Sequence, residues 1–206
     1  MKHIIRMVAL VLVVCLLSVN AFAAEKATPS VEQQGGPQVV APKADADETP
    51  AIVVETADGE IIESDDPEVL KVTPLDDSKN LKPEQKEQME KAYTQISEAE
   101  SLAEIAPELP EVLKELKIET PAEELVVRDL VHVSISEKLE KALEATEGNG
   151  LKVTFKMDLA EGETLIVLVQ NEDGEWVIVY GDDIVIEDGE VTVRLPHVGP
   201  VAFIVV

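Results

Sequence analysis

The sequence is poor in the residues from which catalytic and metal sites are most often built. It has one cysteine, Cys15, which lies in the N-terminal leader described below, and only three histidines in 206 residues. It contains no His-Glu-x-x-His motif or cysteine pair for zinc and no Gly-x-Ser-x-Gly nucleophile elbow. Because His132 and His197 have no evident catalytic partner, we expect both to be structural. These absences argue against a thiol, serine or zinc hydrolase and against a disulfide-stabilised fold.

Basic residues are few as well. The chain has 17 Lys and Arg against 42 Asp and Glu, a net charge of −25, which becomes −27 if residues 1–23, with two basic residues and no acid, are removed. Nucleic acid and anionic lipid are bound by clustered Lys and Arg, so we expect neither as a partner. Cationic surfaces and divalent ions stay open, although a charge of this size chiefly keeps a secreted protein dispersed.

The N-terminal segment, residues 1–23, has the pattern of a secretory signal peptide. Lys2 and Arg6 precede an apolar run over residues 7–19, and Ala21 and Ala23 place small side chains where a signal peptidase cuts. The run is shorter than the roughly 20 residues of a membrane-spanning helix. We therefore expect cleavage after Ala23, a secreted or cell-surface location and no membrane span afterwards. An uncleaved N-terminal anchor is the alternative.

Cys15 offers a second route to anchoring, because residues 12–15, Leu-Val-Val-Cys, loosely resemble a lipoprotein box. Two features count against it. A valine precedes the cysteine, and the chain stays apolar after it. We therefore do not expect lipidation.

Residues 24–80 have the composition of an acidic, proline-containing tether. Such a stretch buries too little apolar surface to offset its conformational entropy. Within it, Asp58 and Gly59 form a hairpin-turn dipeptide between two short apolar stretches of residues 51–64. An isolated hairpin is marginal in water, so we favour disorder here and leave open pairing of this segment with a sheet.

Residues 81–120 have the pattern of a helical segment with two short helices. Pro83 and Glu84 suit a helix first turn, and Pro107 and Pro110 end the first helix before a second one begins. One apolar helix face is predicted by residues spaced three or four apart: Met89, Ala92, Tyr93, Ile96, Ala99 and Ala103. We expect this face to pack on the protein's own core.

Residues 121–206 have the pattern of an antiparallel β domain. Residues 151–159 alternate between apolar and polar side chains, as a half-buried strand does, and Asp188 and Gly189 form a two-residue hairpin turn. A short helix is expected over residues 137–146. Further strands are expected over residues 124–136, 164–170, 175–180, 183–187, 190–195 and 201–206. The fold class predicted is mainly β with a helical segment, as a sandwich or an open barrel, and we favour a small Ig-like sandwich.

The C-terminal stretch RLPHVGPVAFIVV, residues 194–206, resembles at first sight the Leu-Pro-x-Thr-Gly signal that sortases use for cell-wall attachment. Val198, however, stands in place of the threonine, and only seven residues follow Gly199, far fewer than a membrane-spanning stretch of roughly 20. Residues 201–206 instead form an apolar run of strand length. We expect them to form a closing strand that is buried on both faces.

The order of these patterns resembles the C-terminal module of uncharacterised secreted proteins from Gram-positive, clostridia-like gut bacteria. The resemblance covers the chain from Val126 to Val206. It rests on LVVRDLVHVSIS, on VTFKMDLAEGETLIVLVQNEDGEWVIV, on the hairpin that follows and on HVGPVAFIV. The resemblance implies a β-sandwich in a cell-surface setting, and it implies no particular activity.

Two candidate sites remain. Asp182 and Asp183 are the candidate calcium ligands, although acids in turns ordinarily form the turn and keep the surface soluble, so we expect no cofactor. Trp176 and Tyr180 lie on one side of the strand over residues 175–180 and are the candidate glycan-binding platform. Because Val177 and Val179 make the other side apolar too, we expect a central strand with Trp176 in the core.

We therefore expect a secreted or cell-surface, non-enzymatic protein with a structural or interaction role and an unknown protein or glycan partner. A glycan-binding module is the first alternative. A small acid-dependent hydrolase is the second, because 42 acids permit many carboxylate pairs without pointing to any one of them. An exposed Trp176 ring would favour glycan binding, and a buried one a structural sandwich.

Overall fold

The strands form two antiparallel sheets, and the helices lie against one of them. The computed structural model describes residues 69–137, 139, 151–157, 159–160 and 162–206, together with Val31 and the backbone of three short strands nearer the N-terminus. The predicted signal peptide, residues 1–23, and most of the predicted helix over residues 137–146 lie outside the described residues. None of the described helices is long and apolar enough to cross a membrane.

The first sheet has five strands. They are β4 (Leu70–Pro74), β5 (Val127–Ile135), β7 (Leu165–Gln170), β8 (Trp176–Val179) and β11 (Gly199–Val205). Their order in the sheet is β4-β5-β11-β7-β8. The closing strand β11 therefore lies in the middle of the sheet, with β5 on one side and β7 on the other.

The second sheet is built from β1 (Gln38–Val39), β2 (Ile52–Glu55), β3 (Ile61–Ser64), β6 (Leu151–Lys156), β9 (Ile184–Glu187) and β10 (Glu190–Leu195). Its order is β3-β2-β6-β10-β9, and β1 also pairs with β6. Strand β9 is thus an edge strand, with β10 as its neighbour.

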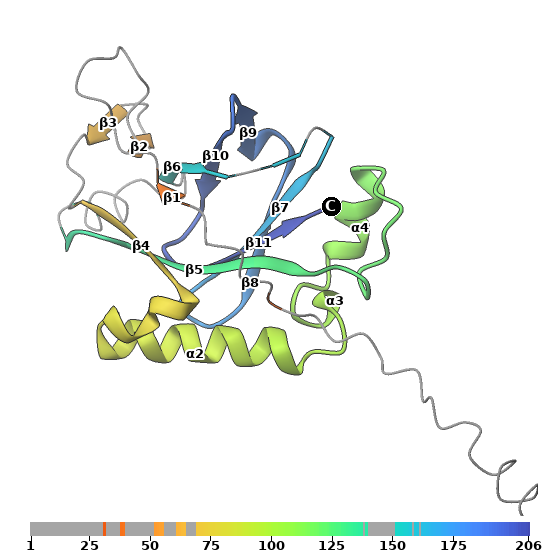
Figure 1. Ribbon diagram of the computed structural model, residues 1–206, viewed down its shortest axis with the longest axis horizontal. Coiled ribbons are helices and arrows are strands. Elements are labelled where there is room, and N and C mark those ends of the chain that lie inside the picture. The colour runs from red at the N-terminus through yellow and green to blue at the C-terminus, as the bar shows by residue number, and fades with distance from the viewer. Residues whose placement is uncertain are drawn as a thin grey trace, which may run out of the picture.

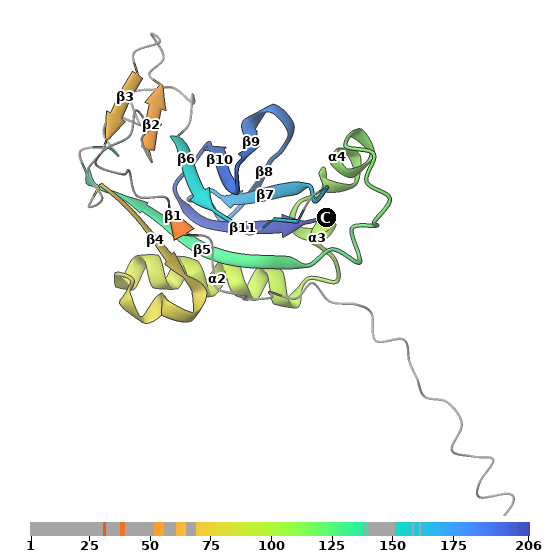
Figure 2. The same ribbon diagram turned by 45° about the horizontal axis from the view of Figure 1, so that its top comes forward.

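The helices cover the outer face of the five-stranded sheet. They are α2 (Pro83–Glu98), α3 (Leu102–Ile105) and α4 (Leu109–Glu115), with 3-10 turns η1 (Leu75–Asn80) and η2 (Gly181–Asp183). Pro83 occupies the first turn of α2, and the Gln85 side chain accepts a hydrogen bond from the backbone N–H of Lys82 at 3.2 Å, which caps the helix. In Figures 1 and 2, α2 runs along β5 on the side away from β6 and β10.

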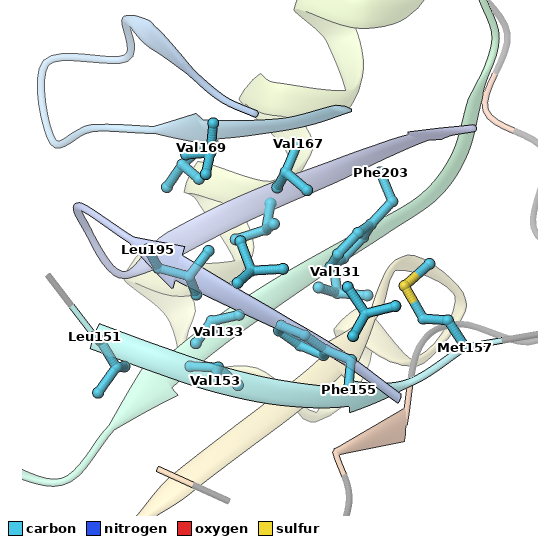
Figure 3. Close-up of a cluster of buried hydrophobic side chains, with 14 of the residues drawn as sticks. Val131, Val133, Leu151, Val153, Phe155, Met157, Val167, Val169, Leu195 and Phe203 are labelled. Atoms are coloured by element: carbon cyan, nitrogen blue, oxygen red, sulfur yellow. The ribbon is translucent and has the colours of Figure 1, made fainter. Parts of the chain in front are cut away.

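The two sheets pack face to face around one apolar core (Figure 3). Phe155 of β6 and Phe203 of β11 meet edge to face, with ring centroids 5.2 Å apart, a favoured aromatic geometry. Alternate residues of each strand point into this core because side chains alternate between the faces of a strand. Among the other contributors are Val131, Val133, Leu151, Val153, Val167, Val169 and Leu195.

A second apolar core lies between the five-stranded sheet and the helices. Its helix side consists of Met89, Ala92, Ile96, Leu102, Ala106, Leu109 and Leu113. Its sheet side includes Leu130, Ile166, Leu168, Ala202 and Ile204. The central strands β7 and β11 are consequently apolar on both faces, and every residue of β7 is buried. This double burial explains why the sequence of these strands is continuously apolar instead of alternating.

The predicted fold class is confirmed at the level of a mainly β protein with two antiparallel sheets and a few short helices. The Asp188–Gly189 hairpin turn is confirmed as well. Both residues have positive φ angles, 50° and 81°, and Glu187 pairs with Glu190, as in a type I′ turn. Residues 201–205 of the predicted closing strand belong to β11, which begins two residues earlier at Gly199 and is buried except at Val205, while Val206 lies just beyond its end.

Three segments differ from the sequence prediction. The C-terminal part of the predicted tether is structured, because residues 70–74 form β4, paired with β5, and residues 75–80 form η1. The hairpin within residues 51–64, for which we favoured disorder, forms β2 and β3, and β2 pairs with β6. These strands are stabilised by pairing with a sheet, which the isolated segment cannot reveal. Helix α2 ends at Glu98 and not at Pro107, α3 follows it, and Pro110 lies in the first turn of α4 instead of ending a helix. Tyr93 is exposed instead of packed in the apolar face of α2.

Candidate functional site

A layer of polar side chains lies between α2 and the five-stranded sheet. The Oε1 atom of Gln95, on α2, accepts hydrogen bonds from the indole Nε1 of Trp176 at 2.9 Å and from Nε2 of Gln170 at 2.6 Å. Nε2 of Gln95 donates to the backbone carbonyl of Gly174 at 3.2 Å. One helix residue therefore holds the strand-to-strand turn between β7 and β8.

Trp176 occupies the core position that its sequence predicts, but the prediction of a central strand is wrong, because β8 lies at the edge of the five-stranded sheet beside β7. Its side chain is only 8% exposed and packs in the helix-side core. Tyr180, on the same side of this segment, donates a hydrogen bond to Glu115 of α4 at 3.1 Å, and this bond to a carboxylate raises the pKa of Tyr180. A sugar-binding platform needs an exposed aromatic face. Trp176 and Tyr180 instead attach the helices to the sheet, an arrangement that gives no support to the candidate glycan platform.

His132 is buried under α2. It lies on β5, pairs across the ladders with Thr73 of β4 and Pro200 of β11, and is 3% exposed. Its Nε2 atom is 3.2 Å from Oε1 of Gln88, a contact that suits the tautomer with the proton on Nε2, because an amide oxygen only accepts. Its Nδ1 atom and the Thr73 hydroxyl are buried without a hydrogen-bond partner.

The chemistry open to His132 is limited by this environment. Burial lowers the pKa of His132 from 6.5 to about 4, so the ring is neutral near pH 7. No carboxylate or nucleophile forms a hydrogen bond with the ring within the described part of the chain. The geometry therefore supports a structural histidine, in line with the sequence-based expectation.

The acidic turn after β8 does not gather its carboxylates around one point. Asp182 and Asp183 lie in η2 and are exposed. Oδ1 of Asp183 forms an ion pair with Nε of Arg194 on β10 at 3.2 Å. Calcium needs six to eight oxygens that converge, and the described residues contain no group of three or more His, Cys, Asp or Glu that could hold a metal ion. This arrangement gives no support to Asp182 and Asp183 as calcium ligands.

Asp129 is a buried carboxylate that the sequence analysis did not single out. It lies at a β-bulge of β5, where the register with β11 shifts. Asp129 is 2% exposed and pairs with Phe203. Its Oδ2 atom accepts a hydrogen bond from Nε of Arg128 at 3.0 Å, while Oδ1 has no partner. At a β-bulge two residues of one strand lie opposite a single residue of its neighbour. Here the Arg128 guanidinium bonds to the carboxylate of the adjacent Asp129 and so compensates its buried charge.

The exposed apolar surface of the described chain is concentrated at β9. Val185 and Ile186 are 47% and 45% exposed, and the third large exposed apolar residue, Tyr93, lies on α2. Val185 pairs with Thr192 and Ile186 with Val191, both on β10. The opposite edge of β9 has no strand beside it among the residues that the structure describes. Figures 1 and 2 place β9 on the far side of the sheets from α2.

Sequence reasoning overlooked the glutamines of the polar layer. Gln88 and Gln95 are seven residues apart, directly before Met89 and Ile96, which are buried and also seven apart. Such a repeat beside an apolar helix stripe places all four side chains near one face. That spacing was the available signal, but a glutamine on an amphipathic helix normally indicates the solvent side.

In comparisons with known proteins, no family model matches the chain, and no curated protein and no solved structure matches it significantly.

Proposed function

We propose that this protein is secreted or displayed at the cell surface and acts without catalysis, as an interaction module. Support for export comes from the leader pattern of residues 1–23, with Lys2 and Arg6 before the apolar run. Support for a non-catalytic role comes from His132, whose ring bonds to an amide and to no carboxylate among the described residues. Both sheet faces of the central strands are filled with apolar side chains.

The observation that carries an interaction role is the exposed edge strand β9. Natural β proteins usually protect an edge strand with charge, proline, a bulge or a covering segment, because an open edge recruits other strands. Here the middle of β9 exposes Val185 and Ile186. An exposed apolar pair on an unpaired edge is a feature of interaction sites.

We also propose that the sheets form an Ig-like sandwich with one strand displaced in sequence. In immunoglobulin domains, strands B-E-D lie in one sheet and G-F-C-C′ in the other. Taking β6 to β11 as B, C, C′, D, E and F, the orders β6-β10-β9 and β11-β7-β8 correspond to B-E-D and F-C-C′. Strand β5 takes the place of G beside β11 although it precedes β6. This arrangement supports the edge position of β9 at the strand D site.

Export is tested by fractionation of the producing cells and by mass spectrometry of the protein's N-terminus. The proposal expects the protein in the medium or on the surface, with Ala24 as its first residue. Recovery in the cytoplasm with residues 1–23 still attached would contradict it.

The interaction role is tested with a photo-crosslinking amino acid at Val185 in the mature chain, residues 24–206, added back to intact producing cells. A matched control carries the crosslinker at Glu87, which is exposed on α2 on the opposite side of the sheets. The proposal expects one surface component to be captured from Val185 and not from Glu87. Equal capture from both positions, or none from Val185, would overturn it. Parallel sedimentation with insoluble cell wall and a glycan panel, with and without calcium, tests the glycan alternative.

A further inference from the structure

We infer, on the basis of the proposed interaction role, that the open edge of β9 binds an extended segment of another protein by strand addition. We further infer that this segment has β-branched residues at its centre and Lys or Arg at both ends. The inference rests on the backbone register of β9, on its two exposed apolar side chains and on the charges that flank them.

The register between β9 and β10 leaves some backbone N–H and C=O groups of β9 pointing away from β10, toward the open edge. Glu187 and Glu190 flank the two-residue turn, and such flanking residues exchange hydrogen bonds with each other. In an antiparallel ladder the hydrogen-bonded pairs alternate with pairs that are not bonded, so the N–H and C=O of Ile186 point away from β10. The N–H of Ile184 is bonded to the carbonyl of Gly181, which leaves its C=O at the open edge.

The side chains of β9 offer an apolar neighbour on each face of an added strand. Consecutive residues point to opposite faces of a sheet. Ile186 is on the face of the intersheet core, since it pairs with the buried Val191, and Val185 is on the outer face beside Thr192. Cross-strand contacts with β-branched side chains stabilise such a pair on either face. The centre of the bound segment is therefore expected to be rich in Val, Ile or Thr.

The ends of β9 require positive charge in the partner. Exposed acids lie on both sides of the apolar pair: Asp182, Asp183, Glu187, Asp188 and Glu190. Arg194 compensates Asp183, and the other four acids form no ion pair with the residues that the structure describes. Opposite charges across a strand pair stabilise it, and like charges destabilise it. The overall charge of −25 also attracts a basic segment from a distance.

The same charges argue against a second copy of this chain as the occupant. Pairing of β9 with β9 would bring a second set of the same acids against the first within a few residues. Repulsion between charges at this distance is weakly screened, because the Debye length is about 8 Å at physiological ionic strength. A basic segment of a different protein meets no such repulsion.

The test uses three synthetic peptides and the mature chain, residues 24–206. The first is Lys-Lys-Thr-Val-Thr-Val-Thr-Lys-Lys. The second has the same centre with Glu in place of every Lys. The third keeps the lysines but has Pro in place of both Val, so that it has the same charge and cannot add to a sheet. Binding is measured by NMR titration, with hydrogen exchange of the Ile186 amide as the local readout.

The inference expects the first peptide to bind and to protect the Ile186 amide, with affinity that falls as salt rises. It expects both other peptides to bind at least about tenfold more weakly, since one loses the charge match and the other loses the ladder. Equal binding of the first and third peptides would show simple charge attraction and overturn the inference, as would no binding of the first. Protection of the Ile186 amide by self-association of the chain, without peptide, would assign the edge to a second copy and overturn it too.

Two variants of the chain make the test specific. Ile186→Pro removes an outward N–H and leaves the hydrogen bonds to β10 intact, so it should abolish binding of the first peptide. The double variant Glu187→Lys with Asp188→Lys reverses the charge at one end of β9, and should bring the affinities of the Lys and Glu peptides together or reverse their order. It keeps the test informative if Ile186→Pro does not fold. Unchanged peptide preference in the double variant would overturn the inference.

The outcomes separate this inference from the proposed function. Capture of a surface component from Val185 combined with no binding of the first peptide would preserve an interaction role and overturn strand addition. Peptide binding without any captured surface component would preserve the binding mode and overturn the interaction role at the cell surface.

Discussion

Trp176 and Gln95 are 81 residues apart in sequence and are joined by a hydrogen bond of 2.9 Å from the indole Nε1 to the amide Oε1. The bond connects the edge strand β8 to α2. Because the same Gln95 oxygen also accepts from Gln170, one amide satisfies two donors that burial removes from water. The helices and the five-stranded sheet are thus fixed relative to each other by a directional contact as well as by apolar packing.

Removal of the Gln95 amide should destabilise the protein. We expect Gln95→Ala to lower the free energy of unfolding by about 1–3 kcal/mol, because two buried donors lose their acceptor. The measurement is urea denaturation followed by Trp176 fluorescence. Glu87→Ala, an exposed position on the same helix, is the matched control and should change stability by less than about 0.5 kcal/mol. Equal effects of the two substitutions would contradict a bonded role for Gln95.

His132 should make stability depend on pH in the acidic range. Its pKa is about 4 in the folded protein and 6.5 as the reference value, so between these values the unfolded chain binds a proton that the folded chain does not. Stability therefore falls as pH drops from 6.5 toward 4 and is independent of this group above pH 6.5. We expect the His132 contribution to fall by about 2 kcal/mol between pH 7 and pH 4.5.

The measurement for His132 is the free energy of unfolding at several pH values for the natural chain and for His132→Gln. The variant lacks the titrating ring, so the difference between the two curves isolates His132 from the many carboxylates. We expect the natural chain to lose stability relative to the variant as pH falls below 6.5. Parallel curves down to pH 4 would show that His132 titrates normally in the folded protein.

The intersheet core should be sensitive to loss of an aromatic ring. Phe155 is fully buried and meets Phe203 edge to face. We expect Phe155→Ala to cost about 3–5 kcal/mol of stability through lost transfer energy and a residual cavity. Val185→Ala, on the exposed edge strand, should cost less than about 1 kcal/mol. Thermal unfolding by circular dichroism measures both, and similar losses would contradict the burial difference.

The hairpin between β9 and β10 should tolerate change at one turn position and resist it at the other. Gly189 has φ of 81° and a Cβ added there would meet no atom within 4 Å, so the cost of Gly189→Ala is backbone strain alone, about 1 kcal/mol or somewhat more. Asp188→Gly places a permissive residue at φ of 50° and should be close to neutral. Chemical denaturation compares the two variants, and a cost for Asp188→Gly as large as that for Gly189→Ala would contradict a type I′ turn.

The sequence predicts those strands that have a local pattern of their own, either alternating apolar and polar residues or a recognisable turn. The alternation from Leu151 onward and the Asp188–Gly189 turn lie close to the observed β6 and hairpin. Strand β4 has no comparable signal. Leu70 and Val72 are set among acids and prolines, and they become part of a sheet only through pairing with Ile135 and Val133. That partner strand lies beyond α2, α3 and α4 in the sequence, where no local pattern can indicate it.

The polar layer was hidden for a related reason. In a sequence, a glutamine that faces solvent looks the same as one that bonds to a buried indole. The role of Gln95 therefore becomes visible only when the structure places β8 against α2. Trp176 was predictable as a core residue, because valines on the other side of its strand indicate a strand covered on both faces. The partner of its N–H was not predictable, since helix and strand are brought together by tertiary packing.

The central position of β11 sets the order in which the fold can be completed. Val201 pairs with Val131, far earlier in the chain, and with Val169 on the other side. Until residues 199–205 emerge from the ribosome, β5 and β7 have no common neighbour and the five-stranded sheet stays divided. Contacts this distant in sequence slow folding, so the five-stranded sheet is expected to form late, once residues 199–205 can pair with both β5 and β7. If the protein is exported as we propose, a channel that accepts only unfolded polypeptide would therefore meet the chain before this sheet is complete.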